Sequence, residues 1–426
     1  MDAAIVETTS SQALALLFKH SVNAEGLDSI LGVIRRHLEM DVAFISRFES
    51  DGRVLDHLDF AQGESCALRR GQRIAASEGY CVKVVRGELP EFIPDTATLP
   101  ETQNIVGTKE IPIGSHLSVP IKINGNEVYG TLCCFSYRPK TFLGDRDMQV
   151  LRAFGEVLSI YFESAIKTEY ERAIAAKEIH TAVAAGAPRI VYQPIFHIED
   201  HRLHGFECLS RFDIPPYRSP DKWFDMAQRA DMGVEIELKA VTSALRTLDK
   251  FPIHVKFSIN SSPELILSGL LLPLLSTVHD LSRVTLEITE HAVVRDYAAL
   301  VEALGPFRAR GMTLAVDDAG AGYSSMRHIL NLEPDIIKLD MSLTQSIDID
   351  QKRKALAKGL TTFFHEIGCL VVAEGVETAS ELEALSKLNV DCAQGYYLSK
   401  PISLEESITL IETTARTNAP QTKPRG

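Results

Sequence analysis

The feature that most restricts how this 426-residue chain can fold is an alternation of short apolar runs with longer segments between residues 188 and 414. From the third run on, the intervening segments are long enough to hold a helix that crosses back over a sheet. Eight strands that alternate with helices over about 225 residues are typical of a (β/α)8 barrel. The predicted strands are 189–196, 205–212, 254–260, 283–289, 312–318, 335–340, 370–374 and 391–396.

The first two predicted strands should depart from the parallel arrangement. Only the eight residues 197–204 separate them. A crossover between parallel strands needs a dozen residues or more. We therefore expect this pair to be antiparallel within an otherwise parallel barrel.

Polar side chains stand at the ends of successive predicted strands, where a barrel builds its active site. Any one of them could be a helix cap or a surface charge. Together they bring six carboxylates to one mouth, which would repel one another unless a cation lies among them. The residues are Glu207, Asn260, Glu287, Asp317, Asp318, Lys338, Asp340, Glu374 and Gln394.

The donor types in this set predict a hard metal ion. Carboxylate and amide oxygens, without clustered Cys or His, suit Mg²⁺ or Mn²⁺ rather than Zn²⁺. The adjacent pair Asp317 and Asp318 could serve two ions, with Asp317 as the bridge. Two metals about 3.5–4 Å apart are a standard arrangement for in-line attack on a phosphodiester.

Eight motifs in the same order make residues 170–414 resemble the EAL domain family. They are Tyr192-Gln193-Pro194, Glu207-Cys208-Leu209-Ser210-Arg211, Asn260-Ser261-Ser262, Glu287-Ile288-Thr289-Glu290, Asp317-Asp318-Ala319-Gly320-Ala321-Gly322-Tyr323-Ser324, Lys338-Leu339-Asp340, Ala373-Glu374-Gly375-Val376-Glu377 and Gln394-Gly395-Tyr396. The resemblance implies a barrel with one antiparallel strand that hydrolyses cyclic di-GMP, a bacterial second messenger, to linear pGpG.

The resemblance also implies a role for each residue. One metal would be held by Glu207, Asn260, Glu287 and Asp317, and a second by Asp317 and Asp318. Lys338 would hold or polarise the attacking water, Glu374 would be the general base or a second-metal group, and Gln394 would orient its neighbours. The residues expected to bind the substrate are Gln193, Leu209, Arg211 and Asp340. Glu290 would anchor the loop after Asp318 and couple it to a dimer interface.

The sequence departs from the family pattern at three positions. Cys208 replaces the alanine of the triplet that names the family, and it carries no ligand role. Ala319 and Ala321 replace a usual phenylalanine and a commonly polar residue, which bears on loop control. Every expected metal ligand is present, which favours an enzyme. The alternative is a non-catalytic cyclic di-GMP receptor or signalling scaffold.

Residues 10–165 resemble a GAF domain, an α+β fold that senses small molecules or dimerises. Helical patterns at 13–20 and 27–37 precede strand-like runs at 42–47, 54–60, 116–123 and 128–136, with a turn at 124–126. The matching motifs are Gly79-Tyr80-Cys81, Ile93-Pro94-Asp95, Ser118-Val119-Pro120-Ile121 and Tyr129-Gly130-Thr131-Leu132. Cys81 could carry a chromophore or sense redox state, or it could be an inert buried cysteine. The ligand of this domain cannot be read from the sequence.

Residues 144–185 predict one long helix that overlaps the GAF region and the barrel at 186–414. Its apolar residues Leu151, Phe154, Leu158, Tyr161 and Ala165 step by three and four. This spacing suits a coiled coil between two chains, or a helix packed on its own domain. We expect a homodimer formed through the barrel and this helix, through which the GAF domain regulates the barrel.

Composition excludes several other classes of protein. A net charge of −13 disfavours binding to DNA, RNA or anionic membranes. The seven cysteines are odd in number and include no CxxC pair, which argues against a disulfide framework or a zinc site. The longest apolar stretch, 265–278, is too short to span a bilayer, and no signal peptide is apparent. We expect a soluble cytoplasmic protein with a disordered tail at 415–426.

Overall fold

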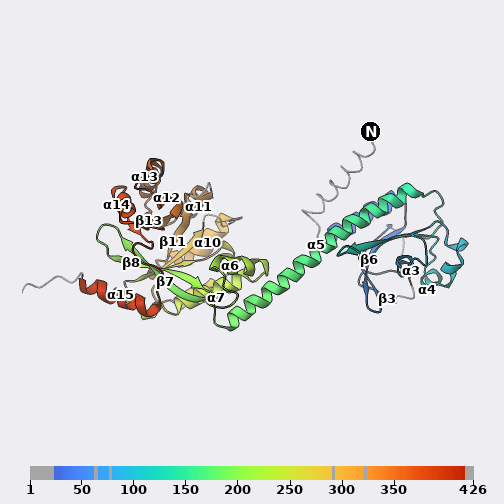
Figure 1. The fold of residues 1–426 in the computed structure, drawn as a ribbon, viewed down its shortest axis with the longest axis horizontal. Coiled ribbons are helices and arrows are strands. Elements are labelled where there is room, and N and C mark those ends of the chain that lie inside the picture. The colour runs from blue at the N-terminus through green and yellow to red at the C-terminus, as the bar shows by residue number, and fades with distance from the viewer. Residues whose placement is uncertain (1–23, 62–65, 76–78, 290–292, 321–323, 418–426) are drawn as a thin grey trace, which may run out of the picture. The chain divides into compact units, whose positions relative to one another are not determined.

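The computed structural model describes residues 24–61, 66–75, 79–289, 293–320 and 324–417 (Figure 1). The chain divides into two compact units, Met1–Glu171 and Arg172–Gly426. Within the described residues, no helix is both long and apolar enough to cross a membrane. The helical pattern expected at 13–20 lies outside the described residues.

The N-terminal unit is built on an antiparallel six-stranded sheet with the order β3-β2-β1-β6-β5-β4. This confirms the expected α+β pattern, including the β5–β6 hairpin with its turn at Asn124 and Gly125, both at positive φ. The short edge strands β3 and β4 carry no alternation long enough to predict. The strands are β1 Val42–Glu49, β2 Gly52–Phe60, β3 Arg73–Ala75, β4 Phe92–Ile93, β5 Ser115–Ile123 and β6 Glu127–Ser136.

The two faces of this sheet pack against different helices. One face, which includes Cys134, packs on α2 (Ala24–His37) and on the first half of α5 (Asp145–Ala184). The other face, which includes Cys133, packs on α3 (Tyr80–Val85). The short helix α4 covers Val106–Glu110. Because side chains alternate along a strand, the adjacent cysteines point into separate cores.

Helix α5 matches the long helix expected at 144–185 almost residue for residue. Leu151 and Leu158 are fully buried in the core of the N-terminal unit. These two residues therefore pack the helix on its own domain. Ala165, the last residue of the predicted apolar series, is exposed. In the second unit, Ile179 of the same helix packs beside Trp223.

The second unit contains a closed eight-stranded barrel with the order β10-β11-β12-β13-β14-β7-β8-β9. Strand β7 pairs antiparallel with both β8 and β14, and the remaining pairs are parallel. The predicted fold and its antiparallel exception are confirmed. The strands are β7 Arg189–His197, β8 Leu203–Arg211, β9 Lys256–Asn260, β10 Val284–Thr289, β11 Thr313–Ala319, β12 Ile336–Leu339, β13 Leu370–Ala373 and β14 Cys392–Ala393.

Helices of varied length surround the barrel. Their bounds are α6 Pro220–Arg229, α7 Gly233–Leu245, α8 Pro263–Leu267, α9 Leu271–Ser276, α10 Tyr297–Arg308, α11 Ser324–Leu332, α12 Met341–Thr344, α13 Gln351–Glu366, α14 Ala379–Lys387 and α15 Leu404–Thr417. The predicted disordered tail is wrong for residues 415–417, because α15 continues through them with no proline or glycine before Pro420.

The last strand is shorter than the predicted run of 391–396, so Gln394 follows the strand instead of lying on it. The chain turns at Gly395, where a Cβ atom would lie 2.1 Å from the carbonyl oxygen of Val376. Only glycine permits this close approach of two backbone segments. The turn directs Gln394 into the mouth of the barrel.

The pleat of β7 and β8 separates the barrel interior from the outer core. Gln193 pairs with Glu207, and the neighbouring pair is Tyr192 with Cys208. Tyr192 and Cys208 join the apolar core that also contains Phe206 and Phe257. Cys208 is therefore a buried packing residue, while Glu207 points the opposite way, toward the ionised groups of the mouth.

The barrel should lose stability in acid through His204. Burial, together with His197, Lys256 and Arg202, lowers the pKa of His204 from 6.5 to about 4. The unfolded chain binds this proton below pH 6.5 and the folded barrel does not, so stability falls between about pH 6.5 and 4. His204→Gln should remove up to roughly 3 kcal/mol of that loss.

Urea unfolding at pH 7 and pH 5 measures this effect, followed by the fluorescence of Trp223. Trp223 is the only tryptophan in the sequence and is buried in the barrel unit. The exposed His254 provides the control, His254→Gln. If wild type and His204→Gln lost the same free energy of unfolding between pH 7 and pH 5, His204 would not be the source of the acid sensitivity.

Candidate active site

Ionisable side chains from four barrel strands meet in one cluster that contains a buried lysine. Glu207 comes from β8, Glu287 from β10, Asp317 from β11 and Lys338 from β12. All four are buried, and Lys338 is 1% exposed. Glu374, in the residue after β13, completes the group and is half-buried. The structure thus brings together these five of the residues that the strand-end pattern singled out.

The ammonium group of Lys338 contacts four carboxylates at once. Its Nζ atom lies 2.7 Å from Glu374 Oε1, 3.1 Å from Glu287 Oε2, 3.2 Å from Asp317 Oδ2 and 3.4 Å from Glu207 Oε2. One positive charge therefore faces four groups that are each negative when ionised. This imbalance of charge is the central electrostatic fact of the site.

Two amide side chains tie the carboxylates together. Gln394 Nε2 donates to Glu207 Oε2 at 2.6 Å and to Glu374 Oε1 at 2.9 Å. Asn260 Nδ2 donates to Glu207 Oε1 at 3.3 Å. Glu207 is therefore held from two sides, which fixes the direction of its oxygens. The orienting role expected for Gln394 stays a prediction.

Burial acts to raise the pKa of every carboxyl group in the site, and the groups differ in how far nearby charges and hydrogen bonds oppose it. Burial raises the pKa of Glu287 to about 8, with Glu207 and Asp317 acting in the same direction against Lys338. Burial likewise raises the pKa of Glu374 well above its ordinary value and raises the pKa of Asp317. Burial opposes the ionisation of Glu207 too, but Lys338 and Gln394 outweigh it and lower its pKa.

Lys338 itself stays charged. Burial alone would lower the pKa of Lys338, but Asp317, Glu207, Glu287 and Glu374 raise it well above its ordinary value. A buried ammonium ion with four acidic neighbours has no reason to release its proton. The group can therefore act as a fixed positive charge and hydrogen-bond donor.

The donor set fits divalent cations at two adjoining positions. Oxygens of Glu207, Glu287 and Asp317 lie within 4.8 Å of one another, as do oxygens of Asp317, Asp318 and Glu374. Asp317 belongs to both groups, and its predicted role as a bridging ligand stays a prediction. Glu287 Oε1 is buried and has no hydrogen-bond partner among the described residues. A buried carboxylate oxygen of this kind suits a metal ion.

The backbone at the end of β11 presents the two aspartates to the mouth. The amide of Asp318 donates to Asp317 Oδ1 at 2.9 Å, which orients that carboxylate. Asp318 has a φ of +58° and Gly320 a φ of +106°. Ala319, between them, is fully buried in the core beside Leu343. The alanine thus packs the base of the loop; Ala321 and Glu290 lie outside the described residues.

The predicted substrate residues occupy three different settings. Gln193 is buried opposite Glu207, and Leu209 is partly buried two residues further along β8. Arg211 lines a cavity of about 600 Å³ and donates to the carbonyl of Ser210. Asp340 caps α12 by accepting from the amide of Ser342 at 2.9 Å. Their role in binding substrate remains a prediction.

One positioning residue was missed in the sequence. The carboxylate of Glu381 accepts from the amides of Ser346 at 2.7 Å, Glu377 at 2.9 Å and Thr378 at 3.0 Å. It therefore holds the backbone that follows Glu374. Thr378 and Glu381 form a capping box, so the Thr-x-x-Glu spacing could have identified it.

A mixed barrel with an acidic, lysine-centred mouth defines the class of protein. The chain belongs to the EAL domain family, whose model matches residues 176–401. A GAF domain model matches residues 24–163. Both matches agree with the families that the motifs indicated.

Individual relatives resemble the barrel unit. The oxygen sensor protein DosP of Escherichia coli is 28% identical over 247 residues, covering 55% of this chain and 31% of DosP. The probable cyclic di-GMP phosphodiesterase PdeG of the same species is 28% identical over 232 residues, covering 52% of this chain and 46% of PdeG. This chain spans about a third to a half of the length of such curated relatives.

Two solved structures share the fold of the barrel at 25% identity. An EAL domain protein from Listeria monocytogenes matches with a TM-score of 0.51, covering 56% of this chain and 98% of that one. The PaMucR phosphodiesterase, in a complex with cyclic di-GMP, matches with a TM-score of 0.50 and covers 55% and 99%.

Replacement of Lys338 by methionine should destabilise the barrel. The substitution removes the ammonium from four carboxyl groups, three of them buried, a loss of about 3–5 kcal/mol in the free energy of unfolding. Added Mg²⁺ or Mn²⁺ should recover part of this loss, because a metal replaces the missing positive charge. Urea unfolding with and without metal, followed by Trp223 fluorescence, provides the measurement.

Lys387→Met serves as the control, because Lys387 pairs with Glu383 on an exposed helix surface. That variant should change stability by less than about 1 kcal/mol. If Lys338→Met were as stable as wild type without metal, the ammonium would not be what balances the carboxylates.

Proposed function

We propose that the barrel is a divalent metal-dependent phosphodiesterase that hydrolyses cyclic di-GMP to linear pGpG. The observation that carries this proposal is the pair of acidic groups that share Asp317 around Lys338. The names of PdeG and of the PaMucR complex support the choice of substrate. The intact ligand set supports catalysis over a receptor that binds the nucleotide without cutting it.

The residues that would hold the metals follow from the two acidic groups. Glu207, Asn260, Glu287 and Asp317 would bind one ion, and Asp317 and Asp318, with Glu374, a second. Asn260 Nδ2 donates to Glu207 Oε1 in the structure, so the amide would turn to offer its oxygen to the ion. Mg²⁺ or Mn²⁺ bound there would supply Lewis acidity toward the phosphate oxygens.

Lys338 and Glu374 would act on the attacking water. Lys338 Nζ lies 2.7 Å from Glu374 Oε1, the shortest of its four contacts with the carboxyl groups. Lys338 would donate a hydrogen bond that holds the water, since its ammonium stays charged. Burial raises the pKa of Glu374, which makes its carboxylate a stronger base toward that water's proton.

Binding of the substrate would rest on the mouth and its rim. Arg211 would meet a phosphate, because a guanidinium can donate two parallel hydrogen bonds to one. Leu209 lies on β8, as Arg211 does, and Gln193 lies on the neighbouring strand β7. Both residues would contact the rest of the nucleotide. Asp340, at the end of β12, would add an acceptor next to the helix that it caps.

Regulation by the N-terminal unit completes the proposal. The GAF domain would sense a small molecule and act on the barrel through α5, the helix that belongs to both units. A homodimer formed through the barrel and this helix would transmit the signal, with Glu290 anchoring the loop after Asp318. Deletion of residues 1–143 should alter turnover if this coupling exists.

Glu207→Gln should abolish hydrolysis while the fold survives. The substitution keeps the shape of the side chain but removes the charge that would bind metal, so turnover should fall on the order of 100-fold or more. Incubation with cyclic di-GMP and Mg²⁺ or Mn²⁺, with separation of pGpG by chromatography, measures the effect. A matched sample with EDTA should form no pGpG.

Glu383→Gln is the control, because Glu383 is exposed on α14. Wild-type protein that binds cyclic di-GMP in calorimetry but forms no pGpG with either metal would favour the receptor. Full activity in Glu207→Gln would refute the ligand assignment.

A further inference from the structure

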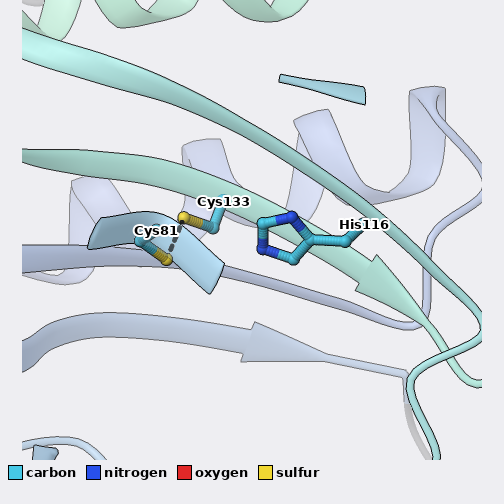
Figure 2. A group of neighbouring side chains, drawn as sticks. All are labelled: Cys81, His116 and Cys133. Carbon is cyan, nitrogen blue, oxygen red and sulfur yellow. Dashed lines mark hydrogen bonds between the residues drawn. The ribbon is translucent and has the colours of Figure 1, made fainter. Parts of the chain in front are cut away.

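A second group of metal-binding side chains lies inside the N-terminal unit, outside the barrel mouth. Cys81 comes from α3, His116 from β5 and Cys133 from β6. Their side chains point into one space, as Figure 2 shows. The two sulfur atoms are 2.9 Å apart, and one ligand atom from each residue lies within 4.8 Å of the others. All three are at most 2% exposed.

We propose that Cys81, His116 and Cys133 bind one thiophilic transition-metal cation of the Zn²⁺ type. Two sulfurs and an imidazole are the soft and borderline donors that such ions prefer over Mg²⁺. The proposed ion is separate from those of the barrel in its ligands and in its chemistry. It also stands independently of the proposed hydrolysis.

The imidazole of His116 is held beside the two sulfurs. The ring of Tyr80 stacks on it at a centroid distance of 4.6 Å. Of the two ring nitrogens of His116, Nε2 is the one nearer to the sulfurs in Figure 2, so Nε2 would bind the ion.

A cavity beside the cluster provides room for a further ligand. Its volume is about 160 Å³, and its lining includes Cys81, His116, Arg53, Phe44 and Phe135. Three protein ligands leave one position open in a tetrahedral zinc site. A small ligand in the cavity could fill that position, with Arg53 favouring an anion.

A disulfide is the competing use of the two sulfurs. They would have to close from 2.9 Å to about 2.05 Å to bond, and to open to about 3.7 Å around a tetrahedral zinc ion. A disulfide would involve neither His116 nor the cavity. A metal ion would use both sulfurs, the imidazole and the adjoining space together.

The test is a Co²⁺ titration of the reduced full-length protein, stripped of metal, in excess Mg²⁺ to occupy the barrel. Cobalt held by thiolates absorbs strongly through sulfur-to-metal charge transfer, which oxygen ligands do not give. One equivalent should produce this band, and one equivalent of Zn²⁺ should remove it. Cys81→Ala, Cys133→Ala and His116→Gln should each weaken cobalt binding on the order of 100-fold.

Cys134→Ala is the matched control, because Cys134 is the next residue on the same strand and is buried in the opposite core. Cys392→Ala tests the other sulfur-containing group, with His197 and His204 in the barrel. Both should keep the band. Circular dichroism checks that each variant is folded.

Three results would overturn the proposal. The first is reduced wild-type protein that shows no cobalt–thiolate band, whether or not thiol counting before reduction shows a Cys81–Cys133 disulfide. The second is a band that survives in both Cys81→Ala and Cys133→Ala. The third is a band that disappears in Cys392→Ala. Loss of pGpG formation with an intact band would refute the proposed hydrolysis and leave this site standing.

Discussion

The constraint on which the barrel mouth depends is the placement of one ammonium group among four carboxylates. Lys338 satisfies Glu207, Glu287, Asp317 and Glu374 from the centre of the barrel, at 2.7 to 3.4 Å. A single positive charge does not neutralise them all, and the raised pKa values of Glu287 and Glu374 express the excess. The mouth is thus held together by one cation and prepared to accept more.

Much of the surrounding structure keeps this arrangement in position. The turn at Gly395 directs Gln394 onto Glu207 and Glu374. The amide of Asp318 orients Asp317, and Glu381 holds the backbone beyond Glu374. Such supporting contacts fix the direction of ligand oxygens, on which the affinity and selectivity of a metal site depend.

The two units offer opposite kinds of metal-ligand atoms. The barrel offers oxygen donors, whereas the N-terminal unit offers two sulfurs and an imidazole. Hard ions such as Mg²⁺ prefer the first set and thiophilic ions the second, so each site would select its own ion in the presence of the other. The long helix α5 contributes residues to the cores of both units.

The sequence by itself determined the barrel, its antiparallel exception and the acidic residues of the mouth. Strand periodicity is local, and a closed barrel brings every strand end to one rim, so the position of Asp317 or Lys338 along the chain implied its place in space. No such rule linked Cys81, His116 and Cys133, which are separated by 35 and 17 residues on three elements. The absence of a CxxC pair even argued against a thiolate site. Only the packing of α3 on the sheet brought them together. Contacts between separate elements depend on tertiary geometry, so they produce no regular residue spacing that could be recognised in the sequence.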